Sequence, residues 1–433
     1  MLYIVFGTNK VKRKGMLLKQ YINHHINSVS AGGLYNNTKK KTNTLFSRYK
    51  QFIMFGYNVY PQRFTFINQI SPLQNGVEAY PAMLNSMLNA KFEVLILSYI
   101  FDYDIETKKF LDVFKLLIKK GIKIKVLVDG VGTFKLFHSS IEKQLAKING
   151  LEYGIFLPPH IPISLPFVNF RNHRKIMIID RTIAFLGSMN LSKNNVLIHD
   201  IKNGVIDITF KIQGQVIDQL LKVFRNDWEF ANKMPCKLLS YNKKIQDLQG
   251  ETMPARIISS GPNSKIDKIE FIIHGAINMA QRKITIVTPY FLPETNILTA
   301  IKMAAMRKVS VELIVPEHSD CHIIDWARES NFLNLIISGV KIYRTLPPFD
   351  HSKIFIVDDE WIFVGSANWD VRSFKLHFET NIELFSHDLA IILNKIIDKK
   401  KQQAQLVSIY ECKNITFLKK LRNNAARLIT PYG

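Results

Sequence analysis

Two stretches of the chain repeat the same chemically active residues at the same spacing. Each has a histidine, a lysine two residues later, an aspartate five residues beyond that, and then a Gly-Ser pair with an asparagine two residues after the serine. The two copies are His173, Lys175, Asp180, Gly187, Ser188 and Asn190, and His351, Lys353, Asp358, Gly365, Ser366 and Asn368. A lone histidine beside an apolar run is more often structural than catalytic. The repetition, with lysine, serine and asparagine attached, favours catalysis.

These side chains suit a reaction at a phosphodiester. Imidazole titrates near neutral pH, so it can serve as a nucleophile or as a general acid and base. Lysine, serine and asparagine are donors that can be aimed at the non-bridging oxygens, where negative charge builds in the transition state. With two histidines, one can attack phosphorus while the other protonates the leaving alcohol and later deprotonates the acceptor.

The residues around each motif predict a small hairpin that gathers these groups. The apolar runs 176–179 and 354–357, bounded by turn residues, are typical of buried strands. Residues two apart on a strand share a face, so the histidine and lysine of each copy project together. We expect the turn at each aspartate, with a second strand that ends at the Gly-Ser pair.

Elsewhere, strands alternate with helices, which indicates an α/β fold. In the first half we expect helices at 76–91, 107–120 and 215–230, and strands at 94–99, 122–128 and 205–212. In the second half we expect helices at 265–280, 294–306 and 323–338, and strands at 256–260, 283–288, 309–315 and 340–343. The repeated plan predicts two similar domains, each a mixed β-sheet flanked by helices, related by a pseudo-twofold with the active site between them.

The expected domain organisation has four parts. They are a basic N-terminal segment (1–64), a first domain with motif one (65–233), a linker (234–254) rich in polar residues, glycine and proline, and a second domain with motif two (255–433). The second domain ends in a basic tail (417–433) that is predicted either to lie on a membrane as an amphipathic helix or to pack on the domain. At 433 residues and 47% hydrophobic composition, the chain can build two substantial cores.

The motifs resemble those of the phospholipase D superfamily, which is marked by a paired His-x-Lys-x4-Asp pattern. The closer resemblance is to bacterial cardiolipin synthases of the phospholipase D type. It rests on residues 172–175 (Asn-His-Arg-Lys), 288–291 (Thr-Pro-Tyr-Phe), 370–373 (Asp-Val-Arg-Ser) and the stretch from 76 to 102, and it covers roughly residues 65–433. The chain departs from the family pattern at His377, where asparagine is usual, and this leaves its fine substrate preference open.

The resemblance implies a phosphatidyltransferase that joins two phosphatidylglycerol molecules into cardiolipin and releases glycerol. His173 would attack phosphorus and His351 would act as acid and base. The superfamily also implies acids that hydrogen-bond the imidazoles, and Asp200 and Glu379 stand at the matching places, 27 and 28 residues after the two histidines. The remaining roles are phosphate contacts from Lys175, Lys353, Ser188, Ser366, Asn190, Asn368 and Arg372, and placement of lysines and loops by Asp180 and Asp358.

Other acceptors define the alternatives. Water would make the chain a phospholipase D hydrolase, serine would make it a phosphatidylserine synthase, and a DNA phosphodiester would make it a nuclease. The formal net charge of +23 suits nucleic acid or an acidic membrane surface equally. Superfamily nucleases commonly carry one motif per chain, so nucleic acid is the less favoured partner. A binding or scaffolding role is disfavoured because both motifs retain histidine and lysine.

The expected setting is a membrane surface in a reducing compartment. The three cysteines, at 236, 321 and 412, suggest neither disulfides nor a zinc site, and no cofactor or metal is expected. Residues 1–77 hold eleven Lys and Arg and no acid, and their apolar runs are too short to span a bilayer. We interpret them as a membrane-contact arm, with a transit segment as the alternative. The resemblance places the chain peripherally on the cytoplasmic side of the bacterial inner membrane, or else in mitochondria.

Overall fold

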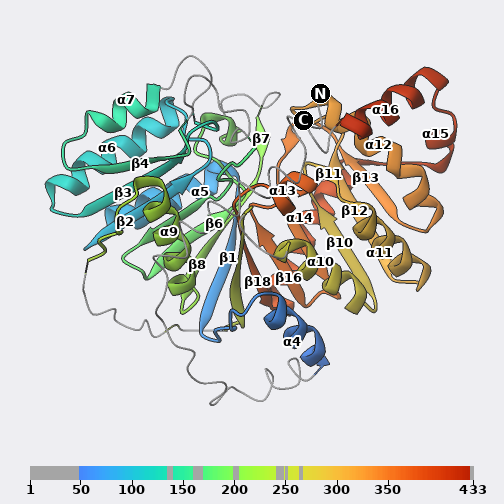
Figure 1. The fold of residues 1–433 in the computed structure, drawn as a ribbon, viewed down its shortest axis with the longest axis horizontal. Coiled ribbons are helices and arrows are strands. Elements are labelled where there is room, and N and C mark those ends of the chain that lie inside the picture. Colours follow the sequence, from blue (N-terminus) through green and yellow to red (C-terminus); the bar gives the residue numbers. More distant parts are fainter. Residues whose placement is uncertain are drawn as a thin grey trace.

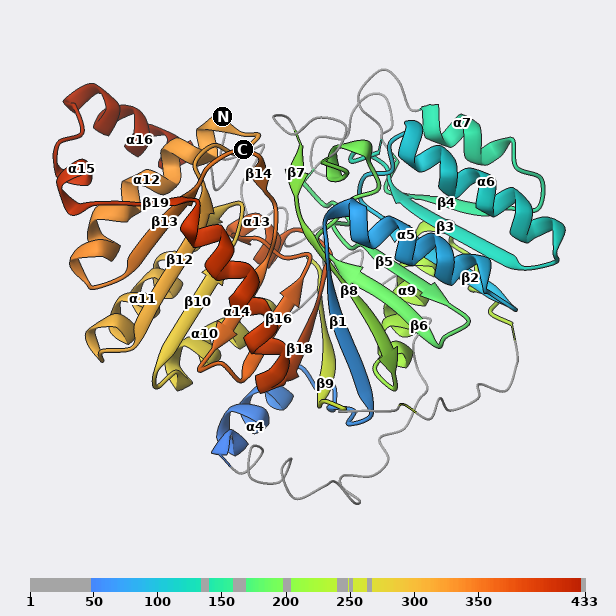
Figure 2. The same cartoon turned by 180° about the vertical axis from the view of Figure 1, so that it is seen from behind.

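The structure, a computed structural model, consists of two similar halves set side by side. It describes residues 48–133, 140–158, 169–197, 204–239, 248, 252–262 and 267–429. Each half contains one large twisted sheet flanked by helices, as Figure 1 and the reverse view in Figure 2 show. The expected fold class is therefore confirmed. Most of the predicted linker and of the basic N-terminal segment lies outside the described residues.

The two sheets share one strand order, which is the structural trace of the sequence repeat. In the first sheet the order is β1 (Asn68–Gln74), β8 (Ile208–Gly214), β6 (Ile183–Gly187), β5 (Ile176–Ile179), β2 (Glu93–Ser98), β3 (Lys123–Asp129) and β4 (Glu152–Phe156). In the second it is β9 (Ala255–Ser260), β18 (Glu379–Phe385), β16 (Trp361–Gly365), β15 (Ile354–Val357), β10 (Lys283–Val287), β12 (Ser310–Pro316), β13 (Lys341–Thr345) and β19 (Ala404–Leu406). Apart from β19, each position in one sheet has a counterpart in the other.

Each motif forms the predicted hairpin at the middle of its sheet. Strands β5 and β6 pair antiparallel, as do β15 and β16, and every residue of β5 and β15 is buried. The turns place Asp180 and Asp358 at positive φ, in the left-handed region that aspartate tolerates better than most residues. The motif sequences thus determine the local structure.

Helices cover both faces of each sheet. Those of the first half are α5 (Asn75–Leu88), α6 (Ile105–Lys119), α7 (Ser140–Ala146) and α9 (Ile217–Asn232), with a 3-10 turn, η1 (Lys193–Asn195). Those packed with the second sheet are α4 (Lys50–Val59), α10 (Lys268–Met279), α11 (Thr295–Met306), α12 (His322–Ile337), α13 (Val371–Lys375), α14 (His387–Gln402), α15 (Ile409–Lys413) and α16 (Phe417–Ile429). A capping box at Asp104 fixes the start of α6, because its carboxylate accepts two of the first backbone N–H groups.

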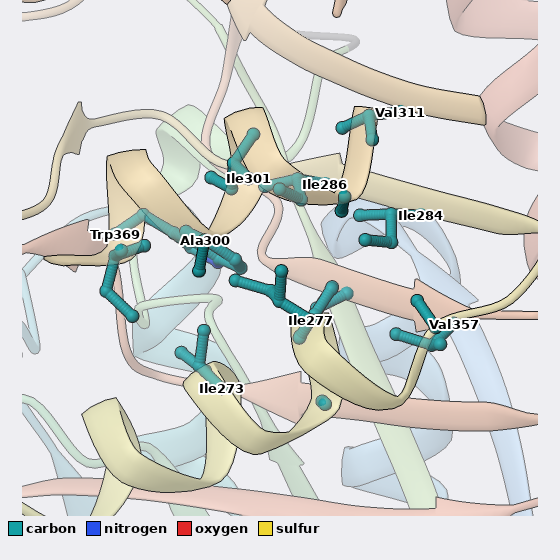
Figure 3. Close-up of a cluster of buried hydrophobic side chains, with 14 of the residues drawn as sticks. Ile273, Ile277, Ile284, Ile286, Ala300, Ile301, Val311, Val357 and Trp369 are labelled. Atoms are coloured by element: carbon teal, nitrogen blue, oxygen red, sulfur yellow. The ribbon is translucent and has the colours of Figure 1, made fainter. Parts of the chain in front are cut away.

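Apolar packing holds both halves and the junction between them. Figure 3 shows the cluster in which Ile273 and Ile277 of α10 and Ile301 of α11 pack on the second sheet. A separate cluster runs through the junction, with Ile178 of β5 and Ile356 of β15 among its buried members. An extensive apolar junction resists relative motion of the halves. The site between them is therefore built on a rigid base.

The structure adds three details to the sequence prediction. The strand expected at 205–212 is broken at Asp207 into β8 and the short β7 (Val205–Ile206), which pairs with β14 (Phe349–Asp350) of the other half. Another short pair joins β11 (Phe291–Leu292) and β17 (Trp369–Asp370). Helix α4, inside the predicted N-terminal segment, packs on α10 and buries Phe52.

Among the described residues, no helix combines the length and the apolar character needed to span a bilayer.

Candidate active site

The two motifs meet at one cavity between the halves. His173 and Lys175 reach it from the start of β5, and His351 and Lys353 reach it from the start of β15. The cavity encloses about 630 Å³, which is within the range of small-molecule sites. The predicted meeting of both motifs at the junction is therefore what the structure shows.

Each histidine contacts a carboxylate from the opposite half. Nδ1 of His351 lies 2.8 Å from Oδ2 of Asp207, and the His351 backbone N–H donates to the carbonyl of Ile206 at 2.7 Å. The mirrored arrangement places Nδ1 of His173 3.2 Å from Oε1 of Glu379. The carboxylates face Nδ1 in both cases, which favours the tautomer that leaves Nε2 able to accept a proton or attack phosphorus.

The second-half acid was predicted and the first-half acid was missed. Glu379 lies beside His173, whereas Asp200, chosen by its distance from His173 along the sequence, lies outside the described residues. Asp207 immediately precedes β8 as Glu379 begins β18, and these strands follow the two motif hairpins. Counting from the following strand, not from the histidine, would have selected Asp207. The loop before Asp207 is longer than its counterpart before Glu379. Equal spacing from the two histidines therefore does not lead to equivalent acids.

The two motif serines form hydrogen bonds with the carboxylates that face the histidines. The hydroxyl of Ser188 donates to Asp207 and that of Ser366 donates to Glu379, and both serines are buried. The sequence interpretation had them contacting phosphate oxygens. In the structure each hydroxyl is committed to a carboxylate, because the Gly-Ser end of the hairpin lies against the strand that carries the acid. Asn190 and Asn368 do line the cavity.

The two motif aspartates lie at the far ends of their strands. Asp180 accepts backbone N–H groups of residues 91–93, with N···O distances of 2.7–2.9 Å. Asp358 does the same for residues 281–283. Each therefore fastens the loop that enters the neighbouring strand. The expected placement of loops fits these contacts, whereas neither carboxylate has a hydrogen bond to a motif lysine among the described contacts.

Both motif lysines are buried at the cavity, and burial disfavours their charged forms. Burial lowers the pKa of Lys175 to about 8 and that of Lys353 to about 7, although nearby carboxylates act in the opposite direction. Nζ of Lys353 lies 3.1 Å from Nε2 of His351 and donates to the His351 carbonyl at 2.9 Å. An anion in the cavity would favour the charged ammonium forms. The arrangement is therefore suited to a phosphate group.

The pKa values of both histidines are lowered. For His173 the main cause is burial, followed by the neighbouring His377, while Glu379 acts in the opposite direction. For His351 the causes are burial and then the charge of Lys353, opposed by Asp207. Burial alone would raise the pKa of Glu379, but the two adjacent imidazoles outweigh it and hold that carboxyl ionised. A neutral His173 with a free Nε2 is the form that can attack.

Other side chains complete the walls. The ring of Tyr99 lies 4.2 Å from that of His173, and the ring of Tyr290 lies 6.5 Å from that of His351. Arg372, predicted to contact phosphate, is not among the cavity-lining residues, and its Nη2 lies 3.4 Å from Oδ1 of Asn169.

Arg174 crosses between the halves, which the sequence alone did not indicate. Its Nη2 donates to Ser259 and to the Ser260 carbonyl, each at 2.8 Å. Its Nε donates to the Glu379 carbonyl at 3.2 Å. This motif side chain therefore ties the two halves together beside the acid that faces His173.

His377 is a further buried imidazole beside the first histidine. Its ring lies 4.1 Å from that of His173, and its Nδ1 lies 3.8 Å from Oε1 of Glu379. Neither ring nitrogen of His377 has a hydrogen-bond partner among the described residues. His173, His377 and Glu379 each offer a ligand atom within 4.8 Å of the others. Two imidazoles and one carboxylate are a donor set that Zn²⁺ accepts.

Comparisons with known proteins agree with this geometry. A family profile described as "Cardiolipin synthase, PLD-like domain" matches residues 83–228 and 273–401, more than half of the chain. Cardiolipin synthase 1 of Staphylococcus epidermidis is 33% identical over 369 residues, covering 84% of this chain and 74% of that protein. A cardiolipin synthase of Clostridium perfringens is 29% identical over 437 residues, covering 99% and 90%. The crystal structure of a phosphatidylserine synthase from Haemophilus influenzae shares the fold, with a TM-score of 0.68, 16% identity, and coverage of 88% of this chain and 100% of that one.

Proposed function

Because the chain belongs to the cardiolipin synthase family of phospholipase D-like phosphatidyltransferases, we propose that it makes cardiolipin from two molecules of phosphatidylglycerol and releases glycerol. The observation that carries this proposal is the single cavity that holds two histidines, each contacting a carboxylate of the opposite half, and two lysines. These groups match the needs of a two-step transfer at phosphorus.

In the first step Nε2 of His173 attacks the phosphorus of one phosphatidylglycerol. A P–N bond forms as the P–O bond to the glycerol headgroup breaks, and His351 gives its proton to the departing oxygen. Lys175 and Lys353 stabilise the charge on the non-bridging oxygens. Binding of the anionic phosphate raises the pKa of His351, which supplies the protonated acid that this step requires.

In the second step the phosphatidyl group leaves His173. His351, now neutral, takes the proton from the free hydroxyl of a second phosphatidylglycerol, and that oxygen attacks phosphorus. The P–N bond breaks, which restores His173 and releases cardiolipin. Glu379 stabilises the imidazolium of His173 during the intermediate, and Asp207 does the same for His351.

The direct test supplies phosphatidylglycerol vesicles to the purified protein and resolves the lipid products. Cardiolipin and glycerol in equal amounts are the expected result. Phosphatidic acid as the sole product would mean that water is the acceptor, which would reject the transferase reaction in favour of hydrolysis. Cleavage of a plasmid without lipid turnover would reject the lipid assignment altogether.

Paired variants test the division of labour. His173→Ala is expected to abolish cardiolipin formation and leave no lipid on the protein after quenching with denaturant at alkaline pH, where the P–N bond of the intermediate survives. His351→Ala is expected to abolish turnover too, with slow labelling of the protein by the phosphatidyl group. His387→Ala is the matched control, because His387 is exposed at the start of α14. Equal residual turnover in the two motif variants, near that of the unchanged protein, would reject the paired-histidine scheme.

A further inference from the structure

Helix α16 carries its apolar side chains on the side that faces away from the protein. Phe417, Leu418, Leu421 and Leu428 have exposed fractions of 77%, 75%, 56% and 76%; we refer to these four side chains as the outer apolar face. The side that packs on the protein is instead small and polar, with Asn423 exposed by 2% and Ala426 by 6%. A helix that served only to cover the domain would turn its leucines inward.

The four residues form one continuous stripe. Successive helical residues are about 100° apart, so Phe417, Leu421 and Leu428 fall within roughly 40° of one another and Leu418 lies beside them. Lys420 and Arg427 flank the stripe on one side and are exposed. Lys419 is exposed as well, and no Asp or Glu occurs from residue 412 to the end of the chain. The helix is therefore amphipathic, with basic borders.

Contacts with α12 fix this orientation. Asn423 donates from Nδ2 to Oε2 of Glu329 at 3.1 Å. The guanidinium of Arg422 lies 4.5 Å from the centre of the Trp326 ring. These contacts come from the side of α16 opposite the stripe, so the helix cannot roll its leucines inward without losing them.

The helix lies at the same end of the molecule as residues that line the cavity. Helix α12, on which α16 packs, begins at His322, next to the cavity-lining stretch His318, Ser319 and Asp320. In both ribbon views α16 lies toward the same end as β7, and Figure 2 shows β14 at that end too; both strands contribute cavity-lining residues. A surface held by α16 would therefore lie close to this end of the cavity.

We propose that the outer apolar face of α16 inserts into the boundary between headgroups and acyl chains of an anionic lipid bilayer. Lys420 and Arg427, which flank the stripe, then lie at the level of the lipid phosphates. The choice of a bilayer as the occupant rests on the proposed function, because both substrates of that reaction reside there. A second copy of the chain suits the stripe less well, since facing stripes would bring their basic borders together.

The test measures vesicle binding separately from catalysis. The variant Leu421→Glu/Leu428→Glu puts two charges into the stripe, and Leu88→Glu/Leu116→Glu is the matched control. Leu88 of α5 and Leu116 of α6 are each 42% exposed and lie in the other half. Binding is followed by flotation with vesicles containing phosphatidylglycerol, and turnover is measured both on those vesicles and on short-chain phosphatidylglycerol in detergent micelles.

We expect the α16 variant to bind vesicles at least tenfold more weakly and to lose turnover on them in proportion. Turnover in micelles should match that of the unchanged protein, and the control variant should behave normally in each assay. The milder pair Lys420→Gln/Arg427→Gln, which removes the two charges that flank the stripe, should weaken binding to anionic vesicles about tenfold or more, while leaving weak binding to neutral vesicles unchanged. This second variant keeps the test decisive if the glutamate variant is unstable.

Three results would overturn the proposal. The first is normal vesicle binding by both α16 variants. The second is an equal loss of vesicle binding in the Leu88/Leu116 control. The third is an α16 variant that loses self-association but binds vesicles normally, which would assign the stripe to a second copy of the chain. Failure of the proposed function is distinct, because a chain that makes no cardiolipin in micelles can still be scored for vesicle binding through α16.

Discussion

His351 belongs to the second half of the chain, but its Nδ1 lies 2.8 Å from a carboxylate oxygen of Asp207 in the first half. The reciprocal pair is His173 and Glu379, at 3.2 Å. The backbone follows the same pattern, because each histidine N–H donates to the carbonyl of the residue that precedes the opposite acid. Each half therefore supplies one imidazole and the acid that orients the other imidazole.

The crossed acids give the first prediction. Asp207→Asn and Glu379→Gln keep the size of each side chain but remove the charge that stabilises the imidazolium and its tautomer. By analogy with the corresponding change in a serine protease triad, kcat should fall by about 10²–10⁴-fold in each. Steady-state assays on phosphatidylglycerol vesicles measure this directly.

The control for Asp207→Asn is Asp200→Asn, because Asp200 is the acid that spacing from His173 along the sequence selects. We expect the smaller loss of kcat in Asp200→Asn. A loss as large as that of Asp207→Asn would show that the contact between His351 and Asp207 does not identify the functional acid.

The serines give a second prediction, because their hydroxyls donate to the acids. Ser188→Ala should lower kcat about tenfold through the position of Asp207 and leave KM nearly unchanged. Loss of a direct phosphate contact made in the ground state would instead raise KM. Ser188→Thr, which keeps the hydroxyl, is expected to recover part of the lost kcat.

The sequence allowed most of this site to be predicted, because the motif sets the geometry of each hairpin locally. Alternating strand residues place His173 beside Lys175, and the repeat implied that both motifs share one site. The contacts that escaped prediction depend on the packing of the two halves. Asp207 follows a loop of different length from its counterpart, Arg174 crosses to Ser260, and sequence periodicity could not show which face of α16 would be buried.

A third prediction concerns the stability cost of the cavity. Burial lowers the pKa of Lys353 from 10.5 to about 7, so at neutral pH the unfolded chain binds more protons at this lysine than the folded chain does. Stability from this group therefore rises with pH from about 7 to 10.5. Lys353→Met should abolish turnover yet raise the free energy of unfolding at pH 7 by about 1–3 kcal/mol.

Thermal or urea unfolding at several pH values measures the effect. The gain in Lys353→Met should be greatest at pH 7 and below and should shrink as the pH approaches 10. Lys123→Met is a control for loss of an exposed lysine, because Lys123 is exposed at the start of β3. A gain that did not vary with pH would contradict a cause in the titration of Lys353.

A fourth prediction follows from the stacked imidazoles. After burial, His377 is the next largest cause of the lowered pKa of His173. His377→Asn removes that cause, so the pKa of His173 should rise and less of it should be neutral at a given acidic pH. The acidic limb of kcat/KM should therefore move to higher pH. A limb that stayed in place, or moved to lower pH, would refute this coupling.

The last prediction concerns Zn²⁺ at His173, His377 and Glu379. Coordination of Zn²⁺ by Nδ1 of His173 would leave the remaining ring proton on Nε2, the nitrogen that must attack phosphorus. The contacts of Nδ1 of His173 and Nδ1 of His377 with Oε1 of Glu379 measure 3.2 and 3.8 Å. Such separations need little adjustment for zinc bonds of about 2.0–2.2 Å. Added Zn²⁺ should therefore inhibit turnover reversibly, and dialysis against EDTA should leave the basal turnover unchanged.

His377→Asn supplies the decisive comparison for zinc, because it removes one ligand and keeps His173 and Glu379. The variant should need at least tenfold more Zn²⁺ for half-inhibition, and calorimetric titration should show the same loss of zinc affinity without any substrate present. His274→Asn, on the partly exposed surface of α10, controls for nonspecific binding. Equal zinc sensitivity in His377→Asn and the unchanged protein would place the inhibitory ion elsewhere, and loss of turnover in EDTA would instead indicate a metal that the reaction requires.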